Sequence, residues 1–358
     1  MANRIISSTD TSGNTSVIVN SDHSILIVGV GVDTTKEVIF NITSTTEAIT
    51  HFGPSSVAVQ LVNTLIKNGV SYIKGINIAE FGEAKPYATK ELAYAGALAK
   101  TMTDEDIKCI ILDCVDSTVT AVLNTHLTNA ETAELARYGV VGVSAATITV
   151  AGATAIATAL NGSRMFVAYP NVTDANNVVL DGTYTAAGIA AIIMTCTDDP
   201  ALPVSGVGIK GFGGIATKLL DTEINTLITA GVTPLYPDNS VPTISRLVTT
   251  AQQVTNVDSV WHDGTTRFIS DNVLESVKSV LKANYKRTKN VSRVINSIRT
   301  DIISVLAEKQ GLEIIQNFDN ANVSVIKDPS NNYGALVDYP IQVVTPLYTI
   351  TITQHLKV

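Results

Sequence analysis

The amino-acid sequence predicts an α/β protein with a mainly parallel sheet core, flanking helices, an α+β C-terminal part and extended N- and C-terminal β arms. Between about residues 25 and 250, short apolar runs alternate with helical patterns, which is typical of a layered α/β fold. The runs are continuously apolar, as in ILIVGVGV from Ile25, and such runs indicate strands buried on both faces of a parallel sheet. With 358 residues and 45% apolar side chains, the chain is long enough to bury such a core.

The first elements are predicted from composition and from helix-capping signals. Residues 1–20 are polar and rich in Ser, Thr and Asn, with a short β-branched stretch at Val17, Ile18 and Val19, so we expect an extended arm. Ser44 and Glu47 have the spacing of a capping box at the start of a helix. The remaining ranges expected here are strands from Ile25, over 37–42 and over 71–78, and an amphipathic helix over 55–68 that ends at Gly69.

Strand and helix patterns continue to alternate through the middle of the chain. One stretch, between Arg137 and Arg164, has no charged residue and is long enough to span a bilayer. Its small residues and its division into two pieces favour a buried strand, turn and helix instead. The predicted helices cover 90–102, 119–127, 150–160, 186–195 and 221–230, and the predicted strands cover 109–113, 138–143 and 165–169.

The pattern changes after about residue 250. We expect a strand over 259–269, two long helices over about 272–286 and 291–309, and a β-rich end over 323–358 that finishes in strict alternation. The chain is therefore predicted to divide into an N-terminal arm (1–20), an α/β region (21–250, with a small inserted subdomain around 80–200 left open), a C-terminal α+β part (251–342) and a C-terminal arm (343–358).

Composition excludes several classes of function. A net charge of −8 and a pI near 5.1 argue against a nucleic-acid partner, which would require a basic surface. The first twenty residues lack the continuous apolar segment of a secretory signal peptide, so we expect no signal peptide. We also expect no membrane partner. The three cysteines, Cys109, Cys114 and Cys196, are too few for a disulfide framework.

No set of residues predicts catalysis, a cofactor or a metal. Gly29-Val30-Gly31 follows a strand, but Thr34 stands where a third glycine would be and another strand follows, so a phosphate-binding helix start is missing. The glycine-rich segment 208–214 lacks the GKS or GKT ending of a P-loop and is better explained as a structural loop. No histidine lies at metal-ligand spacing from another histidine or a cysteine, and no G-x-S-x-G elbow occurs.

One charged segment is unusual. Residues 276–300 contain seven basic side chains and no acidic one, although the whole chain is acidic. Lys278, Lys282 and Lys286 are spaced four residues apart, which places them on one face of a helix. Because like charges at that spacing repel, a stripe of one sign favours an acidic partner surface over an ordinary solvated face. The other basic residues of this segment are Arg287, Lys289, Arg293 and Arg299.

The order of these pieces resembles that of contractile tail sheath proteins of bacteriophages and of phage-tail-like particles such as R-type bacteriocins. The similarity covers nearly the whole chain from about residue 20, and its specificity lies in the order of the segments. The segments that carry it are VIFNITSTTEAITHFG, LVNTLIKNGVSYIKGINI, RMFVAYP followed by TAAGIAAIIM, EINTLITAGVTPL, SRLVTTAQ, TRFISDNVLESVKSVL and the alternating end YTITITQHL.

The resemblance implies a structural subunit that is not an enzyme. Sheath subunits of this family form hexameric rings that stack helically around an inner tail tube protein, and they meet baseplate and tail terminator proteins at the ends. Contraction drives the tube through a cell envelope. The resemblance places the protein in a phage tail or tail-like particle made in the bacterial cytoplasm.

The resemblance also assigns roles to residues of this chain. Terminal arms of the family exchange strands with neighbouring subunits, here through Val17, Ile18 and Val19 and through Tyr348, Ile350 and Ile352. C-terminal helices of the family face the tube, which implies a tube-facing role for Lys278, Lys282, Lys286, Arg287, Lys289 and Arg293. Two alternatives stay open from the sequence: an enzyme on a doubly wound α/β scaffold, and another self-assembling shell protein.

Overall fold

The computed structural model describes residues 23–145, 149–195, 199–251 and 260–348, and the backbone alone of 6–9 and 15–18. Its centre is an eight-stranded sheet in the order β12-β11-β8-β7-β6-β3-β5-β4. All neighbouring strands in it are parallel except the two edge pairs, β4–β5 and β11–β12. The predicted mainly parallel α/β fold is confirmed. The strands are β3 (Ser24–Gly29), β4 (Ile39–Ile42), β5 (Ile73–Asn77), β6 (Ile107–Leu112), β7 (Tyr138–Gly142), β8 (Met165–Tyr169), β11 (Val232–Asp238) and β12 (Val241–Ile244).

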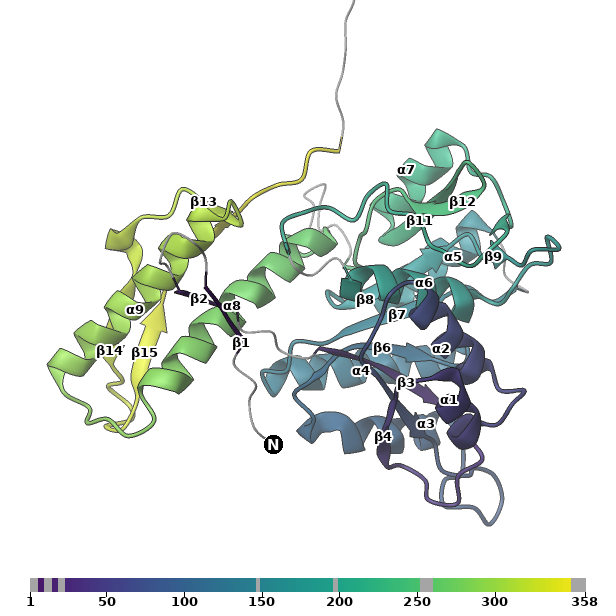
Figure 1. The fold of residues 1–358 in the computed structure, drawn as a ribbon, viewed down its shortest axis with the longest axis horizontal. Helices are drawn as coiled ribbons and strands as arrows, with labels where there is room; N and C mark the ends of the chain where they lie inside the picture. Colours follow the sequence, from purple (N-terminus) through teal and green to yellow (C-terminus); the bar gives the residue numbers. More distant parts are fainter. Residues whose placement is uncertain are drawn as a thin grey trace, which may run out of the picture.

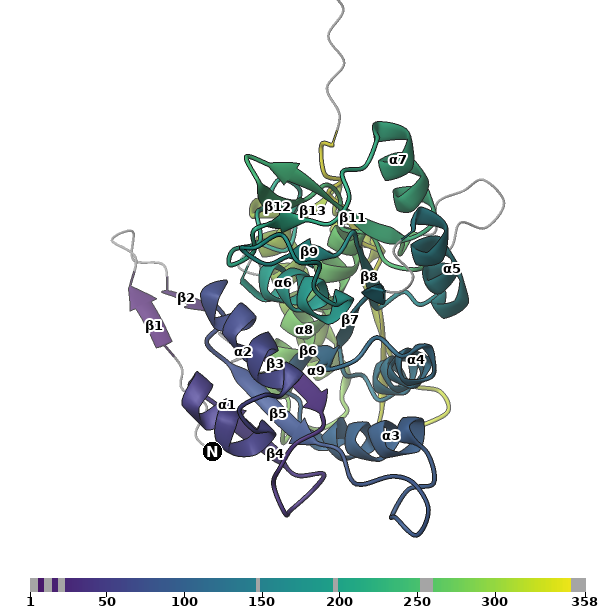
Figure 2. The same ribbon diagram turned by 90° about the vertical axis from the view of Figure 1, so that its right-hand side faces the viewer.

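Helices cover both faces of this sheet, as Figure 2 shows. Because side chains alternate along a strand, Ile25 and Ile27 enter one core with α1, α2 and α6, while Leu26 and Val28 enter a second core with α3, α4, α5 and α7. The first face has α1 (Thr45–Phe52), α2 (Val57–Lys67) and α6 (Gly182–Thr195). The second has α3 (Lys90–Lys100), α4 (Ser117–Thr132), α5 (Val150–Leu160) and α7 (Asp221–Thr229).

A C-terminal unit projects from one side of this α/β unit (Figure 1). It has its own core, to which apolar residues of two helices and of the short strands contribute. Its elements are α8 (Gly264–Asn284), α9 (Ser292–Gly311), β13 (Ile315–Gln316), β14 (Ser324–Lys327), β15 (Ala335–Asp338) and β16 (Gln342–Val343). Strands β13 and β16 pair with each other, as do β14 and β15.

Small elements complete the described part. Strands β9 (Val172–Thr173) and β10 (Gly214–Ile215) pair, and near the N-terminus β1 (Ile6–Thr9) pairs antiparallel with β2 (Thr15–Ile18). Short 3-10 turns follow α3 (Thr101–Thr103) and precede β14 (Asn320–Asn322).

Several local predictions are confirmed and one is wrong. The uncharged stretch between Arg137 and Arg164 contains strand β7 and helix α5, and no helix in the described ranges has the length and hydropathy needed to cross a bilayer. The strand predicted over 259–269 is wrong: among the described residues, 260–262 form a turn and bend, and α8 begins at Gly264. The Asp263 carboxylate accepts a hydrogen bond from the Thr265 N–H at 2.9 Å, and this N-cap favours helix over the β-branched pattern.

Candidate functional site

Helix α8 crosses the amino-terminal ends of four neighbouring strands of the central sheet. Each of these strands has a polar residue at its start that meets the helix: His23 directly before β3, Lys108 as the second residue of β6, Tyr138 as the first of β7 and Arg164 directly before β8. Asp271 contacts the residues from β8 and β7, and Glu275 contacts those from β6 and β3. The order of contacts along the helix therefore follows the order of strands in the sheet.

Asp271 is the most buried carboxylate of this contact. Its two oxygens accept hydrogen bonds from the Arg164 guanidinium at 2.6 and 2.9 Å, and the Tyr138 hydroxyl also donates to it. Burial alone would lower the pKa of Arg164, but the hydrogen bonds and charge of Asp271 outweigh it and raise that pKa. Burial and the charge of Asp271 raise the pKa of Tyr138 well above its usual value. Tyr138 therefore remains a neutral donor.

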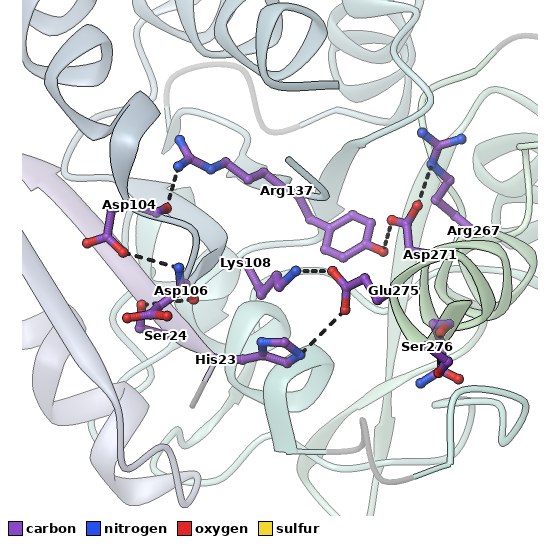
Figure 3. A network of polar contacts seen from close by, with 12 residues as sticks. His23, Ser24, Asp104, Asp106, Lys108, Arg137, Arg267, Asp271, Glu275 and Ser276 are labelled. Carbon is purple, nitrogen blue, oxygen red and sulfur yellow. Dashed lines mark hydrogen bonds and ion pairs between the residues drawn. The ribbon is translucent and has the colours of Figure 1, made fainter. Parts of the chain in front are cut away.

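Three further ion pairs flank Asp271 along the helix. Lys108 pairs with Glu275, and Figure 3 shows His23 pointing at the same carboxylate, 3.9 Å away. Nearer the start of α8, Arg267 pairs with Glu131 at the end of α4. Toward the other end, Lys278 lies 2.8 Å from Glu134. We call these four contacts the α8 seam: Arg267–Glu131, Asp271–Arg164, Glu275–Lys108 and Lys278–Glu134.

The charges of the α8 seam fix the register of the helix on the sheet. Arg267, Asp271 and Glu275 are four residues apart, so a slip of one helical turn moves each into its neighbour's place. A slip in one direction brings Arg267 against Arg164. A slip in the other brings Asp271 against Glu131. Either slip places like charges together, at the buried Arg164 or at the partly exposed Glu131, which is unfavourable. The C-terminal unit is thus held in one position on the α/β unit.

A second buried group at this edge of the sheet is Arg137, which is fully buried directly before β7. Its guanidinium donates to the backbone oxygens of Thr101 and Asp104, each at 2.7 Å, and lies 3.1 Å from His126 Nε2. Burial lowers the pKa of Arg137 to about 10. Burial and the nearby charge of Arg137 lower the pKa of His126 to about 4. His126 is therefore neutral at pH 7 and accepts from Arg137, and the group is structural.

The basic segment is divided by the structure. Helix α8 ends at Asn284, so Lys286 lies in the following turn and does not continue a helical stripe with Lys278 and Lys282. Lys278 is paired with Glu134, and Arg299 donates to the backbone oxygens of Val323 and Asn320.

The other basic side chains of this segment are exposed, and within the described residues none of them forms an ion pair: Lys282, Lys286, Arg287, Lys289 and Arg293. We call these five the basic turn. It lies at the end of the α8–α9 pair that is farthest from the sheet (Figure 1).

The β14–β15 hairpin lies beside the basic turn. The Asn290 side chain donates to the backbone oxygens of Asn332 and Gly334, and these bonds join the two turns. Ile326 and Leu336 are cross-strand partners and are 52% and 47% exposed, whereas Val325 on the other face is buried against α9. Among the described residues, each strand of this hairpin pairs only with the other. Both outer edges therefore keep unpaired backbone groups.

The arm residues are described only in part. Val17 and Ile18 belong to β2, which pairs with β1 of the same chain. Tyr348 contacts its own chain, since its hydroxyl donates to Asp263 Oδ2 at 2.9 Å. Three other predicted arm residues, Val19, Ile350 and Ile352, lie outside the described residues.

Comparison with known proteins decides the family. A model of the phage tail sheath protein central domain matches residues 88–250, and a model of the phage tail sheath C-terminal domain matches residues 256–357. Together the two family models match most of the chain. The chain belongs to the phage tail sheath family. This contractile tail sheath protein is therefore a structural component of a phage tail or tail-like particle, and it is not an enzyme.

Individual relatives agree with this assignment. The tail sheath protein of Bacillus phage SP01 is 27% identical over 206 residues, which are 56% of this chain; the chain spans about a third (34%) of that relative. The fold is similar to the helical sheath of the anti-feeding prophage in its contracted state, with a TM-score of 0.72 and 14% identity over 98% of this chain and 94% of that one. It is also similar to a sheath tail protein of Listeria innocua, with a TM-score of 0.71 and 11% identity over 90% and 92% of the two chains.

The glycine segments have structural roles in this sheath protein. The Val30 N–H after β3 donates to Asp113 at 2.8 Å, and the strand predicted to follow is β4. In the segment 208–214, the backbone N–H of Lys210 donates to the Asn68 side chain at 2.8 Å, and its carbonyl accepts from the same side chain at 3.1 Å. No group of three or more His, Cys, Asp or Glu side chains in the described ranges could hold a metal ion.

Sequence reasoning missed the α8 seam. The strand predicted over 259–269 includes Arg267, so that prediction separates Arg267 from the helical spacing of Asp271 and Glu275. A second signal was present: Lys108 and Arg164 each stand at the beginning of a buried apolar run. Charged residues at the same end of parallel strands meet at one edge of the sheet, and this pattern predicts a charged partner there.

Proposed function

We propose that this sheath protein polymerises as stacked hexameric rings around an inner tube and contracts to drive the tube through a cell envelope. The observation that carries the proposal is the β14–β15 hairpin, which has two open edges and an exposed apolar pair, Ile326 and Leu336. An open strand edge can accept a strand from another chain. The arms, residues 1–20 and 343–358, supply such strands. Contacts of this kind between subunits do not close on themselves, so they build a helical polymer.

The basic turn is the tube-facing surface in this proposal. Its five exposed side chains are Lys282, Lys286, Arg287, Lys289 and Arg293, and they lie at the far end of the C-terminal part, 251–342. Exposed ionic contacts are individually weak, about 0–1 kcal/mol each, and are screened by salt. Such contacts hold an acidic tube surface in the extended state and can be broken when the sheath moves outward. Lys278 contributes less, because Glu134 already neutralises it.

The α8 seam lets each subunit move as one body during contraction. Leaving one charge of a buried ion pair without its partner strongly destabilises a protein. The C-terminal unit therefore stays fixed on the α/β unit, 21–250, while subunits change their packing. The extended arrangement is a metastable packing of folded subunits, and a trigger at the baseplate releases it. Baseplate and tail terminator proteins are the proposed partners at the two ends.

Charge reversal tests the tube-facing role. Lys282, Lys286 and Arg287 are changed together to Glu, and the variant is co-expressed with the tube protein of its particle. We expect folded subunits that form sheath without co-sedimenting tube. A matched control changes three exposed lysines of the α/β unit, Lys100, Lys210 and Lys218, to Glu, with the same change in net charge. Equal tube recovery from both variants would contradict the role of the basic turn.

A further inference from the structure

The last described residue of the C-terminal segment, Tyr348, is fixed to the α/β side of the molecule. Its hydroxyl donates to Asp263 Oδ2 at 2.9 Å, and its ring lies 4.5 Å from the Arg246 guanidinium carbon. Arg246 itself donates to the same Asp263 oxygen at 3.0 and 3.2 Å. The other oxygen of Asp263 caps α8 at Thr265. Tyr348 therefore binds where the α/β unit joins the start of α8.

The residues between β16 and Tyr348 form fewer contacts with the rest of the chain than Tyr348 does. After β16 ends at Val343, the next backbone bond is from Val344 N–H to Ile314 O at 3.4 Å, and Leu347 is 74% exposed. Figure 1 shows this segment leaving the β13 end of the C-terminal unit and running toward the α/β unit. Burial, followed by the charge of Asp263, raises the pKa of Tyr348, so the hydroxyl keeps its proton at neutral pH.

We propose that Tyr348 is a positioning residue that fastens the root of the C-terminal arm to Arg246 and Asp263, so that the exchanged strand begins after it. This inference rests on the arm exchange of the proposed function, and it corrects the role expected for Tyr348 as part of the exchanged strand. An arm pulled by a neighbouring subunit then transmits its load into the α/β unit and the start of α8. The β14–β15 hairpin is not loaded by its own chain's arm.

The contact also sets the length of the tether between subunits. Without it, the arm is rooted at Val343, and five more residues, 344–348, become part of the tether. An extended chain gains at most about 3.3–3.6 Å per residue, so the tether lengthens by up to roughly 18 Å. That slack is large compared with the spacing of strands in a sheet, about 4.8 Å. A looser tether therefore reduces the order of the lattice without preventing strand exchange.

Limited proteolysis of the purified full-length chain, without tube, tests the contact directly. Chymotrypsin cleaves after exposed aromatic residues, and Tyr333, which is 95% exposed, is an internal reference. The readout is the ratio of cleavage after Tyr348 to cleavage after Tyr333, measured by mass spectrometry. We expect this ratio to rise about tenfold in Arg246→Ala and in Asp263→Asn, because each loses a charge-assisted contact. The side-chain oxygen of an asparagine at this position can still accept from the Thr265 N–H and cap α8. Asp263→Asn therefore tests the contact even if Arg246→Ala folds poorly.

The control and the second readout separate positioning from general stability. Lys210→Ala, an exposed change far from the arm in sequence, should leave the cleavage ratio unchanged, and thermal unfolding should show all variants folded. In electron micrographs of assembled sheath, we expect Asp263→Asn to form tubes with weaker helical order than the unmodified chain. An unchanged ratio overturns the contact, and a raised ratio with unchanged helical order overturns the positioning role. If even the unmodified chain forms no tubes, the proposed function fails while the cleavage ratio still decides the contact.

Discussion

Asp271 of α8 holds the guanidinium of Arg164 through both carboxylate oxygens, at 2.6 and 2.9 Å, although the two residues are 107 positions apart in the sequence. Arg164 directly precedes β8, so this pair connects the start of a central strand with the helix that carries the C-terminal unit. The pair is largely buried, and the Tyr138 hydroxyl completes the hydrogen bonding of the carboxylate. It is the central contact of the α8 seam.

Asp271→Asn is expected to destabilise the chain strongly. The substitution keeps the shape but leaves buried Arg164 with only the more exposed Glu131, 3.4 Å from its Nε, as a counter-charge, and removing one partner of a buried pair costs about 3–5 kcal/mol. Urea unfolding measures the change in the free energy of unfolding. The isosteric control is Glu134→Gln at the exposed end of the seam, where the loss should be at most about 1 kcal/mol. Equal effects of the two variants would contradict a central role for Asp271.

His126 makes stability depend on pH in a defined window. Its pKa falls from an ordinary 6.5 to about 4 on folding, so the unfolded state binds the proton first. The stability that depends on neutral His126 is fully present above pH 6.5 and is lost as pH falls toward 4. Between pH 7.5 and 5 the loss is about 2 kcal/mol, from 1.36 kcal/mol per pKa unit.

The matched variant for this pH dependence is His126→Gln, whose side-chain oxygen can accept from Arg137 without titrating. Urea unfolding at pH 7.5, 6 and 5 should show a shallower decline for the variant than for the unmodified chain. Parallel declines would mean that His126 is not the titrating group.

The exposed apolar pair on the β14–β15 hairpin is expected to matter for assembly and little for folding. Ile326→Ser combined with Leu336→Ser should change the free energy of unfolding by less than about 1 kcal/mol, as is usual for exposed positions, while abolishing tubes in electron micrographs. Val325→Ser on the buried face of the same hairpin is the comparison and should lower stability instead. Normal tubes from the double variant would argue against this hairpin as the acceptor of arm strands.

Removal of residues 349–358 is expected to leave a folded, soluble single chain. The deletion leaves Tyr348 in place and removes none of the core residues in the described ranges, but it takes away the alternating segment that is predicted to exchange. Size-exclusion chromatography with light scattering measures the mass. A second variant, Ile350→Ser with Ile352→Ser, keeps the chain length and should also stay unassembled. Ordered tubes from the shortened chain would rule out strand exchange through the C-terminal arm.

The sequence was sufficient for elements whose signals are local. Ser44 and Glu47 begin a helix as predicted, although the Glu47 carboxylate accepts from Thr43 rather than from the capping Ser44. Gly69, with φ of 90°, follows the end of α2 as expected. Helix α4 begins at Ser117, two residues before its predicted start, because the Asp116 side chain caps it by accepting a hydrogen bond from the Thr118 N–H.

Contacts between distant segments could not be predicted in the same way. Spacing within α8 shows that its charges share a face, but the identity of Arg164, Lys108 and Glu131 as their partners depends on how the sheet is ordered. The arms are a stronger case. Their partners in the proposed function belong to other copies of this chain. The sequence therefore contains both the alternating strand and the β14–β15 edge, but no local signal indicates that the two pair between subunits.

Assembly of this chain as a sheath around a tube can be seen by negative-stain electron microscopy. The purified full-length protein is imaged alone at high concentration and after co-expression with the tube protein of its particle. We expect hollow, cross-striated tubes with six-fold end views, filled by a tube in the co-expressed sample. Dispersed globular particles under both conditions would contradict sheath assembly.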